Sequence, residues 1–366
     1  MNLFPNLAKA YSQDNLTARE AQRSAEFIAF GPIVFQVSRL MLKYGILDLL
    51  REKEMTQEEI SAATSLSTYA VKVLLEASLS IGTILVNPEK DTYTLSKVGW
   101  FFLNDPATRV NVDFVHDVNY EGFFHLEEAL KESRPAGLKH FGDWPTIYEA
   151  LSSLPEQVKS SWFGFDHFYS NSSFDEALDI VFSLHPSSIL DVGGNTGLWA
   201  RKCVGYDPAV EVTIVDLPQQ LEMMRKAVSG LPGADRIHGC PMNMLDPDAV
   251  FPDTLSPDVI WMSQFLDCFS EDEVLSILSR ISAIMHEGTR LCIMETFWDR
   301  QRFEPAAFCL TMTSLYFTAM ANGNSKMYHS DDMIRLINSA SLEVESIHDG
   351  LGQGHSILIC KKVNIR

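Results

Sequence analysis

Residues 189–197 read Ile-Leu-Asp-Val-Gly-Gly-Asn-Thr-Gly, and residues 198–201 continue as Leu-Trp-Ala-Arg. A short apolar run thus breaks into a loop of small residues before the pattern of a helix begins. This order predicts a strand, a tight turn and a helix N-terminus. Glycines in such a turn let backbone N–H groups approach a ligand closely, because they lack the Cβ atom that disfavours positive φ. We therefore predict that the turn binds a nucleotide-like ligand.

The spacing of the glycines argues against a dinucleotide. The dinucleotide turn has the pattern G-x-G-x-x-G, whereas this turn has Leu198 at the position of the last glycine. Downstream, the β-branched run 212–216 ends in Asp216. A carboxylate at the end of the second strand of a βαβ unit can accept hydrogen bonds from both ribose hydroxyls. The ligand is therefore expected to carry a ribose but not to be NAD.

Three segments in order, 191–197, 215–218 and 258–269, together carry a family resemblance. With them the chain resembles the S-adenosylmethionine-dependent methyltransferases, and within these the small-molecule O-methyltransferases that include the plant phenolic and acetylserotonin enzymes. The resemblance covers nearly the whole chain. It implies an α/β Rossmann-like methyltransferase domain, doubly wound with an antiparallel last strand, and an N-terminal all-helical winged-helix dimerisation domain. It also implies S-adenosylmethionine as the cofactor and methyl transfer to a small aromatic hydroxylated acceptor in a homodimer.

Composition narrows the classes of partner. The chain has 366 residues with 46% hydrophobic content, which suggests two domains, and its formal charge of −19 disfavours nucleic acid and anionic membranes as partners. The six cysteines form no C-x-x-C pair, which argues against a disulfide framework or a metal site. The N-terminus lacks a signal-peptide pattern, and no apolar run reaches the roughly 18 residues of a membrane span. We expect a soluble, cytoplasmic protein.

We predict three parts: a winged-helix-like dimerisation domain (1–105), a helical connector that contributes to the substrate pocket (106–183), and the S-adenosylmethionine-binding domain (184–366). The stretch 27–50 reads as one helix with too many apolar positions for one face, so a partner subunit is expected to cover the surplus.

A capping box at Thr56 and Glu59, a helix over 67–80 and a hairpin with strands 83–86 and 92–95 indicate the winged helix. Its second helix carries Lys72 as its one basic residue, which argues against DNA binding.

The C-terminal part alternates strands with helices, which predicts a parallel doubly wound sheet. The predicted strands are 188–192, 212–216, 258–263 and 290–296. A helix over 270–286 begins with a capping box of Ser270 and Glu273. The segments 342–347 and 356–361 predict a final hairpin. An antiparallel last strand is what the resemblance implies.

The resemblance also implies the residues of the cofactor site. These are Asp191, Gly193, Gly194, Asp216, Leu217, Asn243, Met244 and Ser263. Asn195 replaces a glycine of the family's loop, and asparagine tolerates the left-handed conformation better than other residues. Asn243 and Met244 match an Asp-Met pair that lies beside the adenine in the family.

The acceptor side departs from the family. Asp267 stands where the family has the histidine that acts as general base. An exposed aspartate with a pKa of about 3.9 is a weak base for a phenol, although burial can raise that pKa. Glu295 matches a glutamate that orients the family's histidine, while a second glutamate is replaced around 327–330. We predict Asp267 and Glu295 as the catalytic residues.

Four explanations of this change stay open. Asp267 with Glu295 can serve a more acidic or differently shaped acceptor, or positioning alone can suffice for an acceptor already ionised at neutral pH. A histidine from elsewhere, His167 or His329, can replace the lost base. The fold can bind S-adenosylmethionine for other chemistry, or form a non-catalytic regulatory dimer.

Aromatic residues and methionines predict where a flat acceptor binds. The connector is rich in aromatic residues, and the segment 303–320 repeats them at near-helical spacing with methionines. The predicted pocket residues are Phe165, Phe168, Phe308, Met312 and Tyr316.

Overall fold

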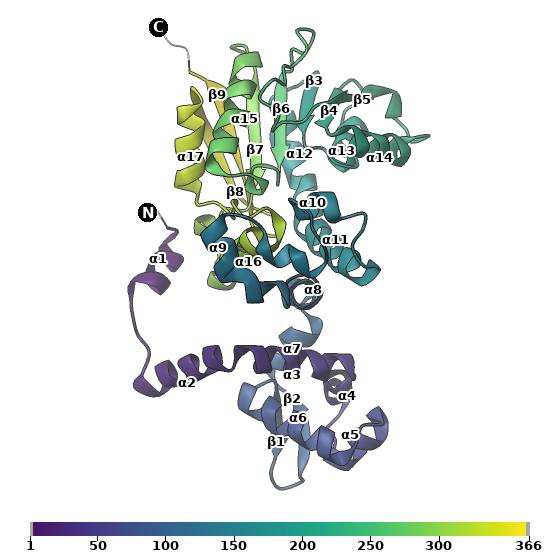
Figure 1. The fold of residues 1–366 in the computed structure, drawn as a ribbon, viewed down its shortest axis with the longest axis vertical. Helices are drawn as coiled ribbons and strands as arrows, with labels where there is room; N and C mark the ends of the chain where they lie inside the picture. Colours follow the sequence, from purple (N-terminus) through teal and green to yellow (C-terminus); the bar gives the residue numbers. More distant parts are fainter. Residues whose placement is uncertain (1–2, 364–366) are drawn as a thin grey trace. The chain divides into compact units, whose positions relative to one another are not determined.

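The computed structural model describes residues 3–363, apart from the side chains of residues 170 and 171. The chain divides into two compact units, one of Met1–Ser12 with Asn119–Arg366 and one of Gln13–Val118 (Figure 1). The predicted domain boundaries within the chain stay predictions, and the predicted outer ends, residues 1 and 366, lie outside the described residues.

The unit Gln13–Val118 is mostly helical and contains one hairpin. Its helices are α2 (Ala18–Ala29), α3 (Gly31–Lys43), α4 (Ile46–Glu52), α5 (Gln57–Thr64), α6 (Thr68–Ile81), α7 (Lys97–Asn104) and α8 (Pro106–Phe114). The antiparallel strands β1 (Ile84–Asn87) and β2 (Thr92–Leu95) confirm the predicted hairpin. The capping box is also confirmed, because Thr56 Oγ accepts the N–H of Glu59 and the Glu59 carboxylate accepts that of Thr56.

The single helix predicted over 27–50 is wrong. Between α2 and α3 the chain bends by 77°, and a second break separates α3 from α4. Proline in the first turn of α3 cannot continue a preceding helix, because it lacks the backbone N–H. Gly45 precedes α4 with a φ of +68°, which favours glycine. Within the described chain no single helix is long and apolar enough to cross a membrane; the bent pair α2 and α3 together meets those criteria.

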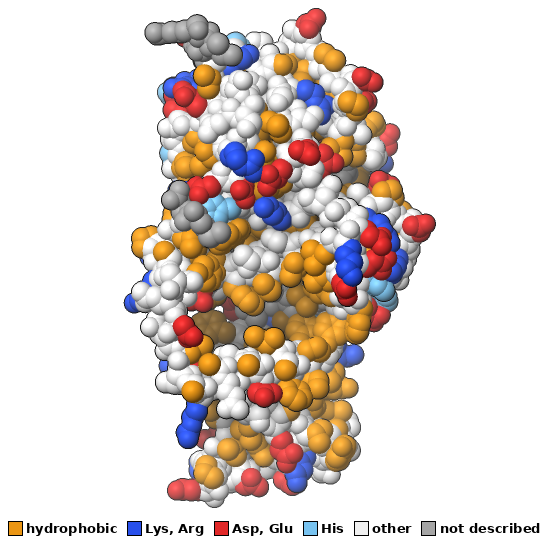
Figure 2. Space-filling view, turned by 60° about the vertical axis from the view of Figure 1, so that its left-hand side comes forward, with side chains coloured by type: hydrophobic (Ala, Val, Ile, Leu, Met, Phe, Trp, Pro, Cys, Tyr) orange, Lys and Arg blue, Asp and Glu red, His pale blue; other side chains and the backbone are white. Residues whose placement is uncertain are grey.

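Apolar side chains are exposed along α2 and α3. Phe27 is 41% exposed, Ile28 80% and Ile33 59%, and Figure 2 shows hydrophobic side chains at the surface of this unit, the lower part of the picture. Such a run of exposed apolar side chains is typical of a surface that binds another protein.

The larger unit is built on a seven-stranded sheet with the order β5-β4-β3-β6-β7-β9-β8. Its strands are β3 (Ser188–Val192), β4 (Glu211–Asp216), β5 (Ile237–Pro241), β6 (Val259–Ser263), β7 (Arg290–Glu295), β8 (Leu342–Leu351) and β9 (His355–Lys362). β3 to β7 are parallel, whereas β9 is antiparallel to both β7 and β8. The four predicted strands and the antiparallel last strand are thereby confirmed.

Helices cover both faces of this sheet (Figure 1). The helices α12 (Phe174–Phe182), α13 (Leu198–Tyr206) and α14 (Pro218–Val228) pack on one face, and α15 (Glu271–Ile284) and α17 (Ser330–Ser339) on the other. Along β6, Val259 and Trp261 join the first core while Ile260 and Met262 join the second. This alternation is the period of a strand buried on both faces.

The same unit contains further helices besides those that pack on the two faces of the sheet. They are α1 (Pro5–Ser12), α9 (Leu126–Glu132), α10 (Ile147–Ala150), α11 (Glu156–Asn171) and α16 (Glu304–Tyr316), joined by 3-10 and π-helical segments. The N-terminal helix α1 belongs to this unit, since Phe4 donates its N–H to the carbonyl of Asp299 and Leu7 is fully buried.

Asp258 ties the amino ends of β3 and β6 together. Its Oδ2 accepts the backbone N–H of Ser187 at 2.8 Å and of Ser188 at 3.0 Å. We predict that Asp258→Ala lowers the free energy of unfolding by about 2 kcal/mol, because two backbone donors lose a charged acceptor. Urea unfolding measures this change. The exposed Asp253→Ala is the control, and equal effects of the two substitutions would contradict the prediction.

Candidate active site

The turn after β3 has the backbone conformation that the sequence predicts. Gly193, Asn195 and Gly197 have φ values of +79°, +48° and +78°, so Asn195 does adopt the left-handed conformation. A Cβ atom at Gly193 would lie 2.3 Å from the ring of Phe265, and one at Gly194 would lie 2.5 Å from Asp191 Oδ2. Glycine is therefore required at both positions, because side chains of the protein occupy the space that a Cβ atom would take.

Asp216, the last residue of β4, lies across this turn. Its Oδ2 accepts the N–H of Asn195 at 2.8 Å and its Oδ1 accepts the N–H of Leu217 at 2.7 Å. Burial raises the pKa of Asp216, and these two hydrogen bonds lower it. The carboxylate is thus fixed beside the glycine turn.

Three polar atoms lie buried at the carboxyl ends of β3 and β6. Asp191 Oδ2, Ser263 Oγ and Gln264 Oε1 have no hydrogen-bond partner among residues 3–363. Burial, and secondarily the charge of Asp216, raises the pKa of Asp191 to about 8. Because buried polar groups normally have partners, these atoms fit a ligand with polar groups at this edge of the sheet.

The remaining predicted cofactor residues follow the carboxyl ends of β4 and β5. Leu217 is 36% exposed, and Asn243 is exposed with its Oδ1 accepting the N–H of Leu245 at 2.9 Å. Met244 is buried in the core that α15 and α17 cover. Their roles beside an adenine stay predictions.

The two predicted catalytic residues lie together. Asp267 belongs to the 3-10 turn Leu266–Cys268, which follows β6, and is buried. Glu295 is the last residue of the neighbouring strand β7 and is also buried. Its Oε1 accepts the N–H of Phe265 at 3.1 Å and of Leu266 at 2.9 Å. Glu295 therefore holds the turn that carries Asp267.

Burial changes the protonation of both carboxyl groups. It raises the pKa of Asp267 to about 7, with the thiol of Cys268 lowering that pKa and Asp166 raising it. Burial, with the charge of Asp267 added, holds the pKa of Glu295 well above its ordinary value. Glu295 Oε2 has no hydrogen-bond partner among residues 3–363. The raised pKa values favour the protonated form of both carboxyl groups, because two neighbouring buried carboxylates disfavour each other's charge.

Residues from α11 and α16 complete the surroundings of Asp267. The indole N–H of Trp162 donates to the hydroxyl of Tyr316 at 2.7 Å, which joins the two helices. Asp166 follows Trp162 by one helical turn, and burial raises its pKa. Burial also raises the pKa of Tyr148 well above its ordinary value, and the charges of Cys268 and Tyr316 add to this. The sequence analysis did not predict Asp166, Tyr148 and Cys268 as site residues. For Asp166, the only indication in the sequence was the position of a carboxylate in a segment rich in aromatic residues.

The predicted pocket residues fall into two groups. Tyr316 is buried, and Phe165 and Phe168 are half-buried with ring centroids 4.9 and 5.2 Å from that of Tyr169. Phe308 and Met312, also on α16, are 59% and 46% exposed. Whether these five residues line an acceptor pocket stays a prediction.

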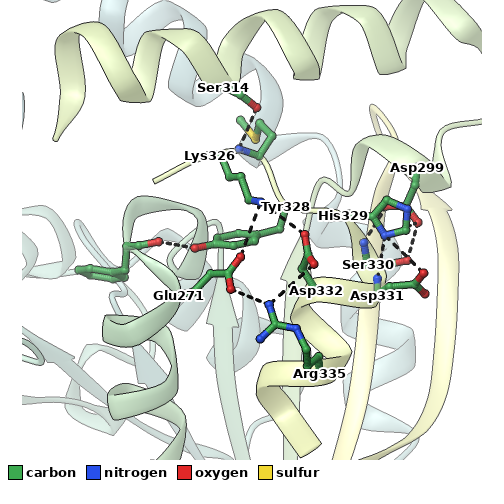
Figure 3. Close-up of polar contacts among 12 residues, drawn as sticks. Glu271, Asp299, Ser314, Lys326, Tyr328, His329, Ser330, Asp331, Asp332 and Arg335 are labelled. Carbon is green, nitrogen blue, oxygen red and sulfur yellow. Dashed lines mark hydrogen bonds and ion pairs between the residues drawn. The ribbon is translucent and has the colours of Figure 1, made fainter. Parts of the chain in front are cut away.

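The two histidines considered as substitute bases lie differently. His329 is buried, and its Nδ1 accepts the N–H of Asp331 at 3.0 Å, which caps α17 (Figure 3). A nitrogen that accepts this bond is not free to take a substrate proton. His167 is exposed on α11. These positions favour Asp267 over either histidine as the base.

Comparisons with known proteins agree with this geometry. The family model described as the O-methyltransferase domain matches residues 123–340, and the model of the Dimerisation2-like domain matches residues 22–93. The L-tyrosine C(3)-methyltransferase of Streptomyces lavendulae is 23% identical over 82% of this chain and 81% of its own. The demethylspheroidene O-methyltransferase of Cereibacter sphaeroides is 24% identical over 83% of this chain and 78% of its own.

Among solved structures, human N-acetylserotonin methyltransferase in complex with S-adenosylmethionine has the same fold. It aligns with a TM-score of 0.65 and 17% identity, covering 97% of this chain and 99% of that one. The family is dependent on S-adenosylmethionine. With a matching family model over more than half of its length, a glycine turn of the expected conformation and a mostly parallel seven-stranded sheet, the chain belongs to the O-methyltransferase domain family of S-adenosylmethionine-dependent methyltransferases.

Proposed function

We propose that this protein methylates a small aromatic acceptor that carries a hydroxyl group, with Asp267 as the base that removes the hydroxyl proton. The observation that carries the proposal is the burial of Asp267, which raises its pKa to about 7. A base is most effective when its pKa lies near the working pH. Family membership makes a binding protein without transfer chemistry, or a non-catalytic dimer, the less favoured explanation.

The residues around the glycine turn fit S-adenosylmethionine. The turn residues Gly193 and Gly194 would lie against its methionine part, and the Asp216 carboxylate would accept the ribose hydroxyls. The unpartnered Asp191 and Ser263 side chains, within residues 3–363, are available to its polar groups. When bound, the cofactor supplies a methyl group on a positively charged sulfur.

The residues that follow β4 and β5 complete the proposed cofactor site. Leu217 and Met244 would flank the adenine. The Asn243 side-chain amide, which accepts the N–H of Leu245 in the structure, would turn to bind the adenine ring. An amide can both accept and donate a hydrogen bond, so Asn243 can still bind adenine in place of the family's aspartate.

The chain's own part in the reaction is to hold the acceptor and move one proton. The acceptor hydroxyl would donate to a carboxylate oxygen of Asp267, which takes its proton as the oxygen becomes nucleophilic. Glu295 keeps the turn in place by accepting the N–H groups of Phe265 and Leu266. The aromatic side chains of Trp162 and Tyr316 would exclude water from the ring of the acceptor.

A second candidate is transfer to the ring carbon next to the hydroxyl. It is supported by the Streptomyces lavendulae relative, whose name is L-tyrosine C(3)-methyltransferase. Loss of the hydroxyl proton places negative charge on the neighbouring ring carbon as well as on oxygen, so one base serves both outcomes. In transfer to carbon, the methyl–sulfur bond breaks as the carbon–carbon bond forms, which gives a dienone. The ring carbon then loses its proton to water and the oxygen regains a proton from Asp267, which restores the phenol. The proton spectrum of the methylated product distinguishes a methoxy group from a ring methyl group.

We also propose that residues 1–105, apart from helix α1, which belongs to the larger unit, form a winged-helix dimerisation domain. Residues 106–183 would form a connector that contributes to the acceptor pocket, and residues 184–366 the cofactor-binding domain. The order of helices and hairpin in Gln13–Val118 supports the winged helix. The six free cysteines support a reducing, cytoplasmic location. The exposed apolar side chains on α2 and α3 support a homodimer.

Asp267→Asn is the substitution that tests the proposed base. We predict that it lowers kcat by about 10²-fold, because an amide cannot take the proton, while affinity for S-adenosylhomocysteine stays within twofold. Asp267→His should restore transfer to simple phenols, since a histidine pKa of about 6.5 suits neutral pH. The measurement is transfer of labelled methyl groups to phenols, catechols, flavonoids and hydroxyindoles. The exposed Asp272→Asn is the control, and wild-type turnover by Asp267→Asn would remove Asp267 from the mechanism.

Asp191→Asn tests two roles of Asp191, its effect on the pH dependence of stability and its proposed contact with the cofactor. Because the pKa of Asp191 is about 8 in the folded protein and about 3.9 when unfolded, the folded state binds an extra proton between these values. Stability therefore falls as the pH rises through this range, and Asp191→Asn removes that loss. We predict that Tm of the variant, relative to wild type, is higher at pH 8.5 than at pH 5.5. Affinity for S-adenosylhomocysteine should fall at least tenfold by calorimetry. The exposed Asp235→Asn is the control, and a pH-independent Tm difference would refute the assignment.

Light scattering tests the homodimer. We predict a dimer mass at micromolar concentration, and a monomer mass after Ile28→Glu combined with Ile33→Glu, because both exposed side chains would place charge in the interface. Val250→Glu, at a residue 80% exposed on the other unit, should leave the dimer intact. A monomeric wild-type protein would contradict this proposal.

A further inference from the structure

The turn that carries Asp267 is held on a second side, opposite to Glu295. Asn322 donates its side-chain N–H to the carbonyl of Cys268. Tyr328 donates its hydroxyl to the carbonyl of Phe269 at 2.7 Å (Figure 3). The backbone N–H groups before Asp267 and the backbone carbonyl groups after it are therefore all hydrogen-bonded to side chains.

Asn322 is itself fixed by its neighbours. Its Oδ1 accepts the N–H groups of Asn324 and Ser325, each at 3.2 Å, and its Nδ2 donates to Ser325 Oγ at 2.8 Å. The amide is thereby oriented with its nitrogen toward Cys268. The orientation of this donor is set by the loop and does not depend on Asp267.

Tyr328 is fixed by burial and by a charged cluster above it. Its ring is 2% exposed, and Lys326 Nζ lies 5.4 Å from the ring centroid. Lys326 in turn lies 3.4 Å from an oxygen of Asp332 and 3.7 Å from one of Glu271 (Figure 3). Burial, with the charge of Glu271 added, keeps the pKa of Tyr328 far above neutral, so the hydroxyl remains a donor.

We propose that Asn322 and Tyr328 are positioning residues for Asp267, holding its turn by the carbonyl side as Glu295 holds it by the amide side. This proposal rests on the proposed function of Asp267 as the base. A base that moves by about 1 Å relative to its substrate loses much of its effect. The same two bonds keep the turn closed and so keep water away from the Asp267 carboxylate.

The pKa of Asp267 depends on how well the hydrogen-bonded turn excludes water from its carboxyl group. Burial is the largest cause of its raised pKa, and the titratable groups that interact with it are Cys268, Asp166, Glu295, Tyr148, Tyr316 and Tyr328. Of these groups the test replaces only Tyr328, whose raised pKa keeps it uncharged near neutral pH, so Tyr328→Phe removes no charge from the surroundings of Asp267. A turn freed on its carbonyl side admits water, and water lowers the pKa of Asp267 toward its ordinary value.

The test uses Tyr328→Phe and Asn322→Ala in the full-length protein. Tyr328→Phe keeps the ring beneath Lys326 but loses the donor, and Asn322→Ala removes the N–H donor without adding a charge near Asp267. Arg335→Gln is the matched control, because Arg335 joins Glu271 and Asp332 in the charged cluster and is 54% exposed (Figure 3). Infrared difference spectra against the same protein with Asp267→Asn give the titration midpoint of Asp267 without any need for turnover.

We expect each of the two variants to lower this midpoint by at least half a pH unit and to lower kcat at least tenfold. The affinity of both variants for S-adenosylhomocysteine should stay within twofold of wild type. For Arg335→Gln, kcat and this affinity should also stay within twofold, and the titration midpoint should not change. Midpoints unchanged in both variants, with Tm showing that they are folded, would overturn the proposal. If wild type transfers no methyl group to any acceptor, the proposed function fails, and the infrared midpoints still decide whether these residues set the environment of Asp267.

Discussion

The hydrogen bonds from the turn after β6 to the carboxyl group of Glu295 are the contact on which the acceptor side depends. Glu295 ends β7, and the turn with Asp267 follows the neighbouring strand, so two adjacent strand ends are joined at the edge where the cofactor site lies. Burial raises the pKa of both carboxyl groups, and a protonated carboxyl group costs less to bury than a carboxylate. The pKa of Asp267, about 7, lets this group exchange a proton near neutral pH. A glutamate that resembles the orienting residue of the family thus acts on the backbone of the turn.

Several carboxyl groups meet at this edge of the sheet. Asp191, Asp216, Asp267 and Glu295 follow the ends of β3, β4, β6 and β7, and burial raises the pKa of each. In a low-dielectric environment like charges disfavour one another, so the ligand-free protein holds some of these groups protonated. A positively charged sulfur compensates part of this negative charge. The same electrostatic arrangement therefore favours the methyl donor and raises the pKa of the proposed base.

The sequence was most informative where local chemistry decides the structure. The alternation along β6, the capping boxes at Thr56 and Ser270 and the left-handed Asn195 all follow from neighbouring residues, and each is present. The strand β5 was missed because this edge strand exposes polar residues and ends in proline. The long helix predicted over 27–50 breaks between α2 and α3 and again at Gly45, because apolar residues at helical spacing can continue from one helix into the next.

The site was predictable only as far as the motifs extend. Asp267 and Glu295 lie on motifs, and the structure brings them together as predicted. Asp166, Asn322 and Tyr328 reach the same turn from α11 and from the segment before α17, and such contacts depend on how distant segments pack. The raised pKa of Asp267 likewise depends on burial, which a pattern of residue types does not specify.

We propose that a buried aspartate acts as the base near neutral pH in place of the family's histidine. The most direct measurement is the rate of methyl transfer in a single turnover of wild-type protein from pH 5 to pH 10, with a phenol whose own pKa is about 10. We predict a rate that rises with a midpoint near 7 and then stays level, as Asp267 loses its proton. A rate that keeps rising to the pKa of the phenol would contradict it, because the acceptor would then ionise without help from the protein.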